Sequence, residues 1–204
     1  MAPLNRFIVP TLAMVAVLGA CRAHGTNAGA AALYADAAQR DPRGKPYVIG
    51  VADVVHVGVW KDESLSTDAI VRPDGTITMP LVGELRAAGR TAAELQQDAS
   101  QRLAAVVKDA AVTVSVTEIN SYRFTVAGNV EHPGLFNARY YLTVSEALAL
   151  AGGPNRYADT DEVVVVRPAN GSLLRIPINY DDILSGKSPE QDIVILTGDS
   201  VRVP

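Results

Sequence analysis

The chain has one cysteine, three histidines and few aromatic residues, and each scarcity excludes a class of protein. A single thiol cannot form a disulfide within the chain, so the stability of the fold must come from packing. His24, His56 and His132 lie far apart, and no Cys/His cluster has the spacing of metal ligands. Lysine and arginine together number 18 against 22 acidic residues. Because no cluster of basic residues occurs, nucleic-acid binding and electrostatic membrane binding are disfavoured.

Long apolar runs are also scarce, and the only one stands at the amino terminus. Arg6 precedes the apolar residues 7–18, and small residues then lead to Cys21. This layout predicts a secretory signal peptide over residues 1–20, which is too short to span a bilayer well. The run Leu18-Gly19-Ala20-Cys21 also resembles the lipobox of bacterial lipoproteins. We therefore expect Cys21 to be lipidated and to hold the chain at the periplasmic face of the outer membrane; the alternative is an ordinary signal peptide.

Residues 21–45 are rich in alanine and glycine and end in the polar turn sequence Asp41-Pro42-Arg43-Gly44. This composition predicts a flexible tether that contains at most a short alanine-rich helix. The residues beyond it suffice for one or two small domains.

Residues 46–118 are expected to form a first α+β module. Val55, Val57 and Val59 alternate with smaller or polar residues, as in a half-buried strand. Residues 72–75, Arg-Pro-Asp-Gly, predict a hairpin turn between the strands 69–71 and 76–79, since proline presets one turn angle and glycine allows positive φ.

The first module also contains a predicted helix. Thr91 and Glu94 have the spacing of a capping box at a helix start. An apolar stripe then follows, with residues three or four positions apart. Its members are Leu95, Ala99, Leu103 and Val106. Residues 112–116 alternate again and predict a closing strand.

Residues 119–204 repeat this order of elements and predict a second α+β module. Thr143 and Glu146 form another capping box, and the short helix that follows ends at Gly152-Gly153-Pro154. Asn170-Gly171 predicts a hairpin turn between two strands. Residues 193–196 and 200–203 are expected to be the last two strands.

Motifs in fixed order connect both modules with known families. Those of the first module are Tyr47-x-Ile49-Gly50-x-x-Asp53, Val71-x-Pro73-Asp74-Gly75-x-Ile77-x-x-Pro80-Leu81-x-Gly83 and Gly89-Arg90-Thr91-x-x-Glu94-Leu95. Those of the second are Val126-x-Gly128-x-Val130-x-x-Pro133-Gly134, Thr143-Val144-x-Glu146-Ala147, Ala151-Gly152-Gly153 and Gly198-Asp199-x-Val201-x-Val203-Pro204. The first set resembles the polysaccharide biosynthesis/export domain. The second is similar to the soluble-ligand-binding β-grasp (SLBB) domain. Any one motif is weak, but their common order and spacing are specific.

The resemblance implies a polysaccharide export protein whose copies assemble as a periplasmic ring around a passage for capsule or exopolysaccharide. The implied partners are the polysaccharide, further copies of the chain and an inner-membrane polysaccharide co-polymerase or kinase. Larger members of the family add a second SLBB domain and a C-terminal amphipathic helix that forms the outer-membrane pore. This sequence stops at Val203-Pro204, so we expect a short form that docks beneath a separate outer-membrane barrel protein.

Catalysis is not expected. Nucleophile-elbow and zinc-protease motifs do not occur, and His56 should face solvent because it alternates with buried valines. Carboxylate pairs that could imitate a glycosidase dyad or a calcium site fall in loops, where solvated acids are the norm. These pairs are Asp62-Glu63, Asp159/Asp161-Glu162 and Asp181-Asp182. We therefore expect no catalytic residue, no metal and no cofactor.

The aromatic residues allow two interpretations. Flat aromatic rings suit the apolar face of a sugar ring, but they also fill cores and subunit contacts, which we favour here. The residues in question are Trp60, Tyr122, Tyr140, Tyr141 and Tyr157. The sequence as a whole predicts a lipid-tethered, non-enzymatic ring component of a polysaccharide exporter. The alternative is a periplasmic adaptor or ligand-binding lipoprotein that contacts the polymerisation machinery without lining a passage; a glycan hydrolase is a third.

Overall fold

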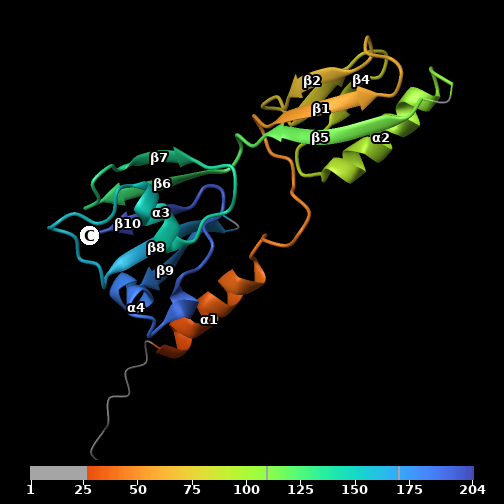
Figure 1. The fold of residues 1–204 in the computed structure, drawn as a ribbon. Helices are drawn as coiled ribbons and strands as arrows, with labels where there is room; N and C mark the ends of the chain where they lie inside the picture. Colours follow the sequence, from red (N-terminus) through yellow and green to blue (C-terminus); the bar gives the residue numbers. More distant parts are fainter. Residues whose placement is uncertain (1–26, 109, 170) are drawn as a thin grey trace, which may run out of the picture.

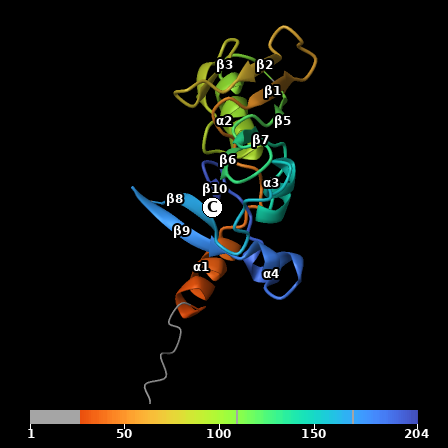
Figure 2. The same cartoon turned by 90° about the vertical axis from the view of Figure 1, so that its left-hand side faces the viewer.

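The computed structural model describes residues 27–108, 110–169 and 171–204, which form two lobes joined end to end (Figures 1 and 2). The first lobe runs from about residue 48 to residue 118, and the second contains the rest of the chain together with an N-terminal helix. Both lobes mix helices with sheets, so the predicted α+β class is confirmed. The predicted signal peptide and Cys21 lie outside the described residues.

The first lobe is built on a three-stranded antiparallel sheet of order β2-β1-β5 and a separate two-stranded hairpin, β3-β4. The strands are β1 (Val54–Val59), β2 (Thr67–Ile70), β3 (Thr76–Met79), β4 (Gly83–Arg86) and β5 (Val112–Glu118). Val55, Val57 and Val59 are buried while their neighbours are partly exposed. The period-two pattern therefore predicted this strand correctly.

The hairpin predicted around residues 72–75 is only partly right. A tight turn is present, because the Gly75 N–H donates to Arg72 O at 2.8 Å and the Arg72 N–H donates to Thr76 O at 2.9 Å. Its flanking strands separate beyond the turn, however: β2 pairs with β1, and β3 pairs with β4. The turn residues specify the local reversal, whereas the partner of each strand depends on which apolar face it must bury.

Helix α2 (Ala92–Ala104) covers the first sheet, as Figure 1 shows. Both hydrogen bonds of the predicted capping box between Thr91 and Glu94 are formed. The apolar stripe is buried as far as Leu103. Its predicted last member, Val106, lies beyond the helix end and is 59% exposed. The spacing of the apolar residues placed Val106 in the helix, but the helix ends before it. An error of one or two residues is usual at helix ends.

The second lobe contains a five-stranded mixed sheet of order β7-β6-β10-β8-β9. Its strands are β6 (Arg123–Gly128), β7 (Gly134–Asn137), β8 (Val163–Ala169), β9 (Ser172–Ile178) and β10 (Ser200–Val203). The chain end β10 pairs in parallel with β6 and antiparallel with β8. Gly128 has a φ of 99°, and a Cβ there would lie 1.9 Å from Val203 O. Glycine is therefore required where the first and last strands of the lobe meet.

Three short helical segments complete the second lobe: α3 (Val144–Leu150), α4 (Tyr180–Leu184) and the 3₁₀ turn η1 (Pro189–Gln191). The predicted capping box at Thr143 and the glycine end of α3 are both present, and the Gly153 N–H donates to Leu148 O. The hairpin between β8 and β9 is also as predicted, with Ala169 opposite Ser172. The strand expected at residues 193–196 is wrong: these residues form only one isolated bridge, between Val194 and Thr143.

Part of the predicted tether is an ordered helix. Helix α1 (Asn27–Gln39) lies against β9 (Figures 1 and 2), where Ala37 is buried in the core of the second lobe. The Tyr34 hydroxyl donates to Pro177 O at 2.7 Å. The sequence allowed a short alanine-rich helix within the tether but not its docking; contact with the edge of the sheet supplies the burial that such a helix lacks on its own.

Candidate functional site

Asp53 ties the two lobes together at their junction. It precedes β1 and is completely buried. Its carboxylate accepts hydrogen bonds from the Tyr47 hydroxyl at 2.6 Å and from the Gly50 N–H at 2.7 Å. It also accepts from the N–H groups of Asn120 and Ser121, both at 2.8 Å. Because the last two residues belong to the connection between β5 and β6, one carboxylate of the first lobe holds the linker to the second.

The linker passes so close to Gly50 that no side chain fits at this position. A Cβ on Gly50 would lie 2.3 Å from Ser121 Cβ. The Tyr47 hydroxyl also contacts Ser121 Oγ at 2.9 Å. Burial, and next the hydrogen bond to Asp53, raise the pKa of Tyr47. The phenol therefore stays protonated at neutral pH, as this hydrogen bond requires.

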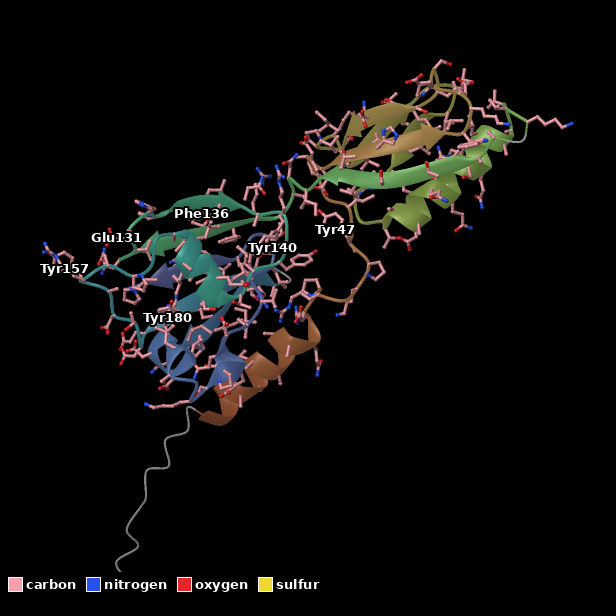
Figure 3. The ribbon with its side chains drawn as sticks, in the orientation of Figure 1. Tyr47, Glu131, Phe136, Tyr140, Tyr157 and Tyr180 are labelled. Atoms are coloured by element: carbon pink, nitrogen blue, oxygen red, sulfur yellow. The ribbon has the colours of Figure 1, made fainter. Side chains whose placement is uncertain are left out.

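A pocket of about 420 Å³ opens beside this junction. Three segments far apart in the sequence line it: the loop after α1, the linker between β5 and β6, and the loop between β7 and α3. Figure 3 shows Tyr47 and Tyr140 near the junction between the lobes. The pocket residues are Arg43, Gly44, Tyr47, Ile119, Tyr122, Arg139, Tyr140 and Tyr141.

The floor of the junction pocket is held rigidly. Tyr122 is 2% exposed, and its hydroxyl donates to Ile195 O at 3.0 Å while accepting from the Leu142 N–H at 3.1 Å. Tyr141 packs edge-to-face on Tyr122, with ring centroids 5.1 Å apart. Burial raises the pKa of Tyr141, which keeps its hydroxyl protonated at neutral pH. Tyr140, in contrast, is 68% exposed at the pocket.

The two arginines of the pocket differ in their partners. Arg43 forms a two-point contact with Asp41, with Nη2 2.8 Å from Oδ2 and Nε 3.1 Å from Oδ1. This contact lowers the pKa of Asp41 and raises that of Arg43. Arg139 makes no side-chain hydrogen bond or ion pair with any residue that the structure describes. The pocket therefore combines one guanidinium that is paired with a carboxylate and one that has no ionic partner among the described residues.

Two family models cover most of the described chain. The model for polysaccharide biosynthesis/export proteins matches residues 41–117, and that for the SLBB domain matches residues 123–177. The chain belongs to the polysaccharide export protein family. The boundary between the two matches falls at residues 118–122, which is the linker that Asp53 holds.

Curated relatives agree with this family assignment. The chain is 28% identical over 195 residues to the EPS I polysaccharide export outer membrane protein EpsA of Ralstonia solanacearum, covering 77% of this chain and 52% of the relative. It is 30% identical over 125 residues to the exopolysaccharide production protein ExoF of Rhizobium meliloti, covering 56% and 30%. It is 28% identical over 145 residues to the polysialic acid transport protein KpsD of Escherichia coli, covering 69% and 25%. The chain spans about half the length of EpsA.

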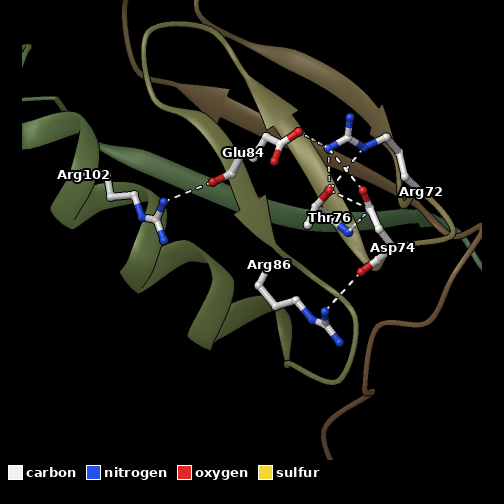
Figure 4. Close-up of polar contacts among 6 residues, drawn as sticks. All are labelled: Arg72, Asp74, Thr76, Glu84, Arg86 and Arg102. Atoms are coloured by element: carbon white, nitrogen blue, oxygen red, sulfur yellow. Dashed lines mark hydrogen bonds and ion pairs between the residues drawn. The ribbon is translucent and has the colours of Figure 1, made fainter.

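The Pro-Asp-Gly motif of the export protein belongs to a polar cluster on the first lobe (Figure 4). Asp74 Oδ1 accepts from the Thr76 N–H and hydroxyl at 2.9 and 2.7 Å, which lowers the pKa of Asp74. Arg72 bridges Thr76 and Glu84, so it ties the turn to β4. Arg86 donates to Asp74 O. These contacts fix the β3–β4 hairpin.

Asp199 of the second lobe has a partner that the sequence did not predict. Arg167 Nη2 lies 2.7 Å from Asp199 Oδ2 and Nε lies 3.0 Å from Oδ1, and both residues are at most 3% exposed. The Leu196 N–H also donates to Asp199, at 2.8 Å. In the sequence, the only indication of this ion pair was Arg167 itself, an arginine within an otherwise apolar strand. Its partner lies 32 residues further along the chain.

The remaining motif residues of the export protein do not converge on one place. They stand at helix caps, turns and strand ends in both lobes, where they define backbone geometry. These are Pro80, Gly83, Thr91, Glu94, Gly128, Pro133, Gly134, Glu146, Gly152, Gly153 and Gly198. Sequence motifs therefore located Asp53 but not the pocket, because most of the pocket residues lie outside the motifs.

Residues considered for catalysis are dispersed in the same way. His56 contacts Asp68 on the partly exposed face of the first sheet, with Nδ1 2.7 Å from Oδ1, and His132 is exposed. The neighbouring Asp161 carboxylate raises the pKa of Asp159, first because protonated Asp159 can donate a hydrogen bond to it and next through its charge, but both side chains are exposed. In the described part of the chain, no three His, Cys, Asp or Glu side chains are grouped to hold a metal ion. The same residues include no helix long and apolar enough to cross a membrane.

Proposed function

We propose that this polysaccharide export protein is a non-enzymatic component of a machine that moves capsule or exopolysaccharide across the cell envelope. The observation that carries the proposal is the succession of a polysaccharide biosynthesis/export domain and an SLBB domain along one chain. Relatives named for polysaccharide export and polysialic acid transport share this region. The two most buried carboxylates support a role without catalysis, because Asp53 and Asp199 are both fully occupied by structural hydrogen bonds.

The protein is proposed to attach to the outer membrane through lipidated Cys21. Cys21 stands six positions before Asn27, the residue at which helix α1 begins. A chain of that length reaches at most roughly 20 Å. Because α1 packs against β9, the anchor would hold the second lobe near the membrane and direct the first lobe into the periplasm. Acyl chains hold a protein at a surface without carrying it across.

Several copies are proposed to form a closed ring around the polymer. The ring would contact an inner-membrane co-polymerase or kinase on one side and a separate outer-membrane barrel protein on the other. Binding of the polymer inside such a passage must be weak and repeated, since a tight site would stop movement.

Deletion of the gene tests the export function. We expect the amount of surface polysaccharide to fall, and the intact gene supplied in trans should restore it. Unchanged surface polysaccharide in a strain that has no second copy of the gene would contradict the proposal.

Electron microscopy of the detergent-extracted protein tests the ring. Closed rings of uniform diameter are expected, whereas a monomer would favour an adaptor that lines no passage. Cys21→Ser tests the anchor separately: the protein should leave the membrane fraction while residues 46–204 stay folded, as judged by circular dichroism.

A further inference from the structure

The junction pocket has the composition of a carbohydrate site. Three of its tyrosines lie at or near the surface; the hydroxyls of Tyr140 and Tyr141 add polar groups to flat apolar faces, while that of Tyr47 is bound to Asp53. Such faces match the C–H side of a pyranose ring, and hydroxyls at the edge can bond to its oxygen atoms. A volume of about 420 Å³ is within the range of small-ligand sites and suits a short segment of a chain, not a whole domain.

The pocket also carries a specific charge. Arg139 lies next to Tyr140 in the sequence and has no ionic partner among the described residues. Arg43 faces the same space, although Asp41 neutralises it. Asp53, the nearest buried acid, is enclosed by four hydrogen bonds and points away from solvent. A carboxylate entering the pocket would therefore meet an available guanidinium, which binds carboxylates through paired hydrogen bonds.

We propose that the junction pocket is a subsite for one acidic sugar unit of a glycan chain, with the sugar ring on Tyr140 and its carboxylate on Arg139. This assignment rests on the proposed export function for its biological meaning, and it adds the class of sugar and the residues that recognise it. The sequence interpretation favoured a core or contact role for the tyrosines. That role holds for Tyr122, but Tyr140 is too exposed for a core residue.

The pocket is lined in part by the segments that connect the two lobes. Tyr47 contributes to the pocket wall and also donates to Asp53, which holds the linker. A sugar bound between the loop at residues 139–141 and the loop at residues 43–47 would therefore contact both the second lobe and the segment that leads into the first. Its affinity should be low, in keeping with a polymer that must keep moving.

The chain offers a matched control for this test. Arg156 and Tyr157 form another adjacent Arg–Tyr pair, with the guanidinium carbon 4.6 Å from the ring centroid. Tyr157 is 68% exposed, the same value as Tyr140, but it lies outside the junction pocket. Figure 3 shows Tyr157 at the far end of the second lobe from the junction. A general effect of exposed tyrosine or arginine would affect both pairs equally.

Saturation-transfer difference NMR on the full-length protein in detergent measures such weak binding. The probes are hexagalacturonate, which carries a carboxylate on each sugar, and maltohexaose, which is neutral. We expect saturation transfer to hexagalacturonate that weakens with added salt, and much less transfer to maltohexaose. Tyr140→Ala should weaken binding about three- to tenfold, and Arg139→Gln about tenfold. Tyr157→Ala and Arg156→Gln should leave it unchanged.

Three outcomes would overturn the assignment: no transfer to hexagalacturonate, equal transfer to maltohexaose, or equal weakening by the Tyr157 and Tyr140 variants. These outcomes are distinct from failure of the proposed function. If gene deletion abolishes surface polysaccharide while the pocket binds nothing, the export function stands and only the subsite is wrong.

Discussion

The core of the first lobe contains only aliphatic side chains and one methionine, whereas the core of the second includes Tyr122 and Phe124. Residues 48–118 contain neither tyrosine nor phenylalanine. The first lobe also keeps its ion pairs near the surface, while the second buries Arg167 and Asp199 together. Two domains of similar size and element order thus differ in how many buried polar groups need partners.

This difference has consequences for stability. An aliphatic core depends on volume alone, because dispersion and the hydrophobic effect are not directional. A core with a buried hydroxyl and a buried ion pair depends also on hydrogen-bond geometry, since an unpartnered buried polar group is costly. Apart from Asp53 at the junction, no charged side chain among the described residues of the first lobe is buried, so the second lobe should respond more strongly to the loss of a buried charge or hydroxyl.

Removal of one charge from the buried pair should have the largest effect. Asp199→Asn leaves the Arg167 guanidinium buried without a counter-charge, and we expect the free energy of unfolding of the second lobe to fall by about 3–5 kcal/mol. Urea titration followed by the near-ultraviolet circular dichroism of tyrosine reports this lobe. In the first lobe, Asp98→Asn removes the partner of Arg90 and Arg102 at the surface and should cost no more than about 1 kcal/mol. Equal costs would contradict the comparison.

The first lobe should instead be sensitive to loss of volume. Leu95 is fully buried under the first sheet, and Leu95→Ala should lower the free energy of unfolding by about 2–5 kcal/mol. Hydrogen–deuterium exchange should show faster exchange in residues 48–118 and little change in residues 123–204. The exposed Val106→Ala serves as control, with an expected change within about 0.5 kcal/mol. Faster exchange across both lobes would show that they unfold as one unit.

The two capping boxes should contribute equally in spite of the different cores. Thr91→Ala and Thr143→Ala each remove a side-chain acceptor at a helix start, and each should cost about 1 kcal/mol in its own lobe. Thermal unfolding monitored by exchange in each lobe compares the two values. Serine at the same positions keeps the acceptor and should restore most of the stability; a large difference between the two threonines would mean that core chemistry affects capping.

Alkaline pH should destabilise the second lobe, but only well above neutrality. Burial raises the pKa of Tyr122 to about 12, so the folded lobe holds this proton more tightly than the unfolded chain does. The stabilisation is complete below pH about 10 and is lost as pH rises toward 12. Urea titrations across this range should show the loss in the wild type and a weaker dependence in Tyr122→Phe. An unchanged pH dependence in Tyr122→Phe would contradict this explanation.

Local patterns in the sequence were sufficient for much of the fold. The alternating valines of β1, both capping boxes and the glycine end of α3 each depend on residues within a few positions, so their outcome is local. The order of motifs along the chain was likewise enough to identify both domains. The incorrect predictions have a common cause, which is dependence on partners distant in sequence. They concern the strands with which β2 and β3 pair, the irregular course of residues 193–196 and the docking of α1.

The candidate site shows the same contrast between what local sequence specifies and what distant contacts decide. The family motifs singled out Asp53, and sugar stacking was one of two interpretations of the tyrosines, a core or contact role being the favoured one. Only the tertiary structure decided that Asp53 holds the linker and that Tyr47, Arg139 and Tyr140 line one pocket. The physical reason is that a pocket and a buried carboxylate acquire their properties from groups that the chain brings together across distances of up to about 100 residues.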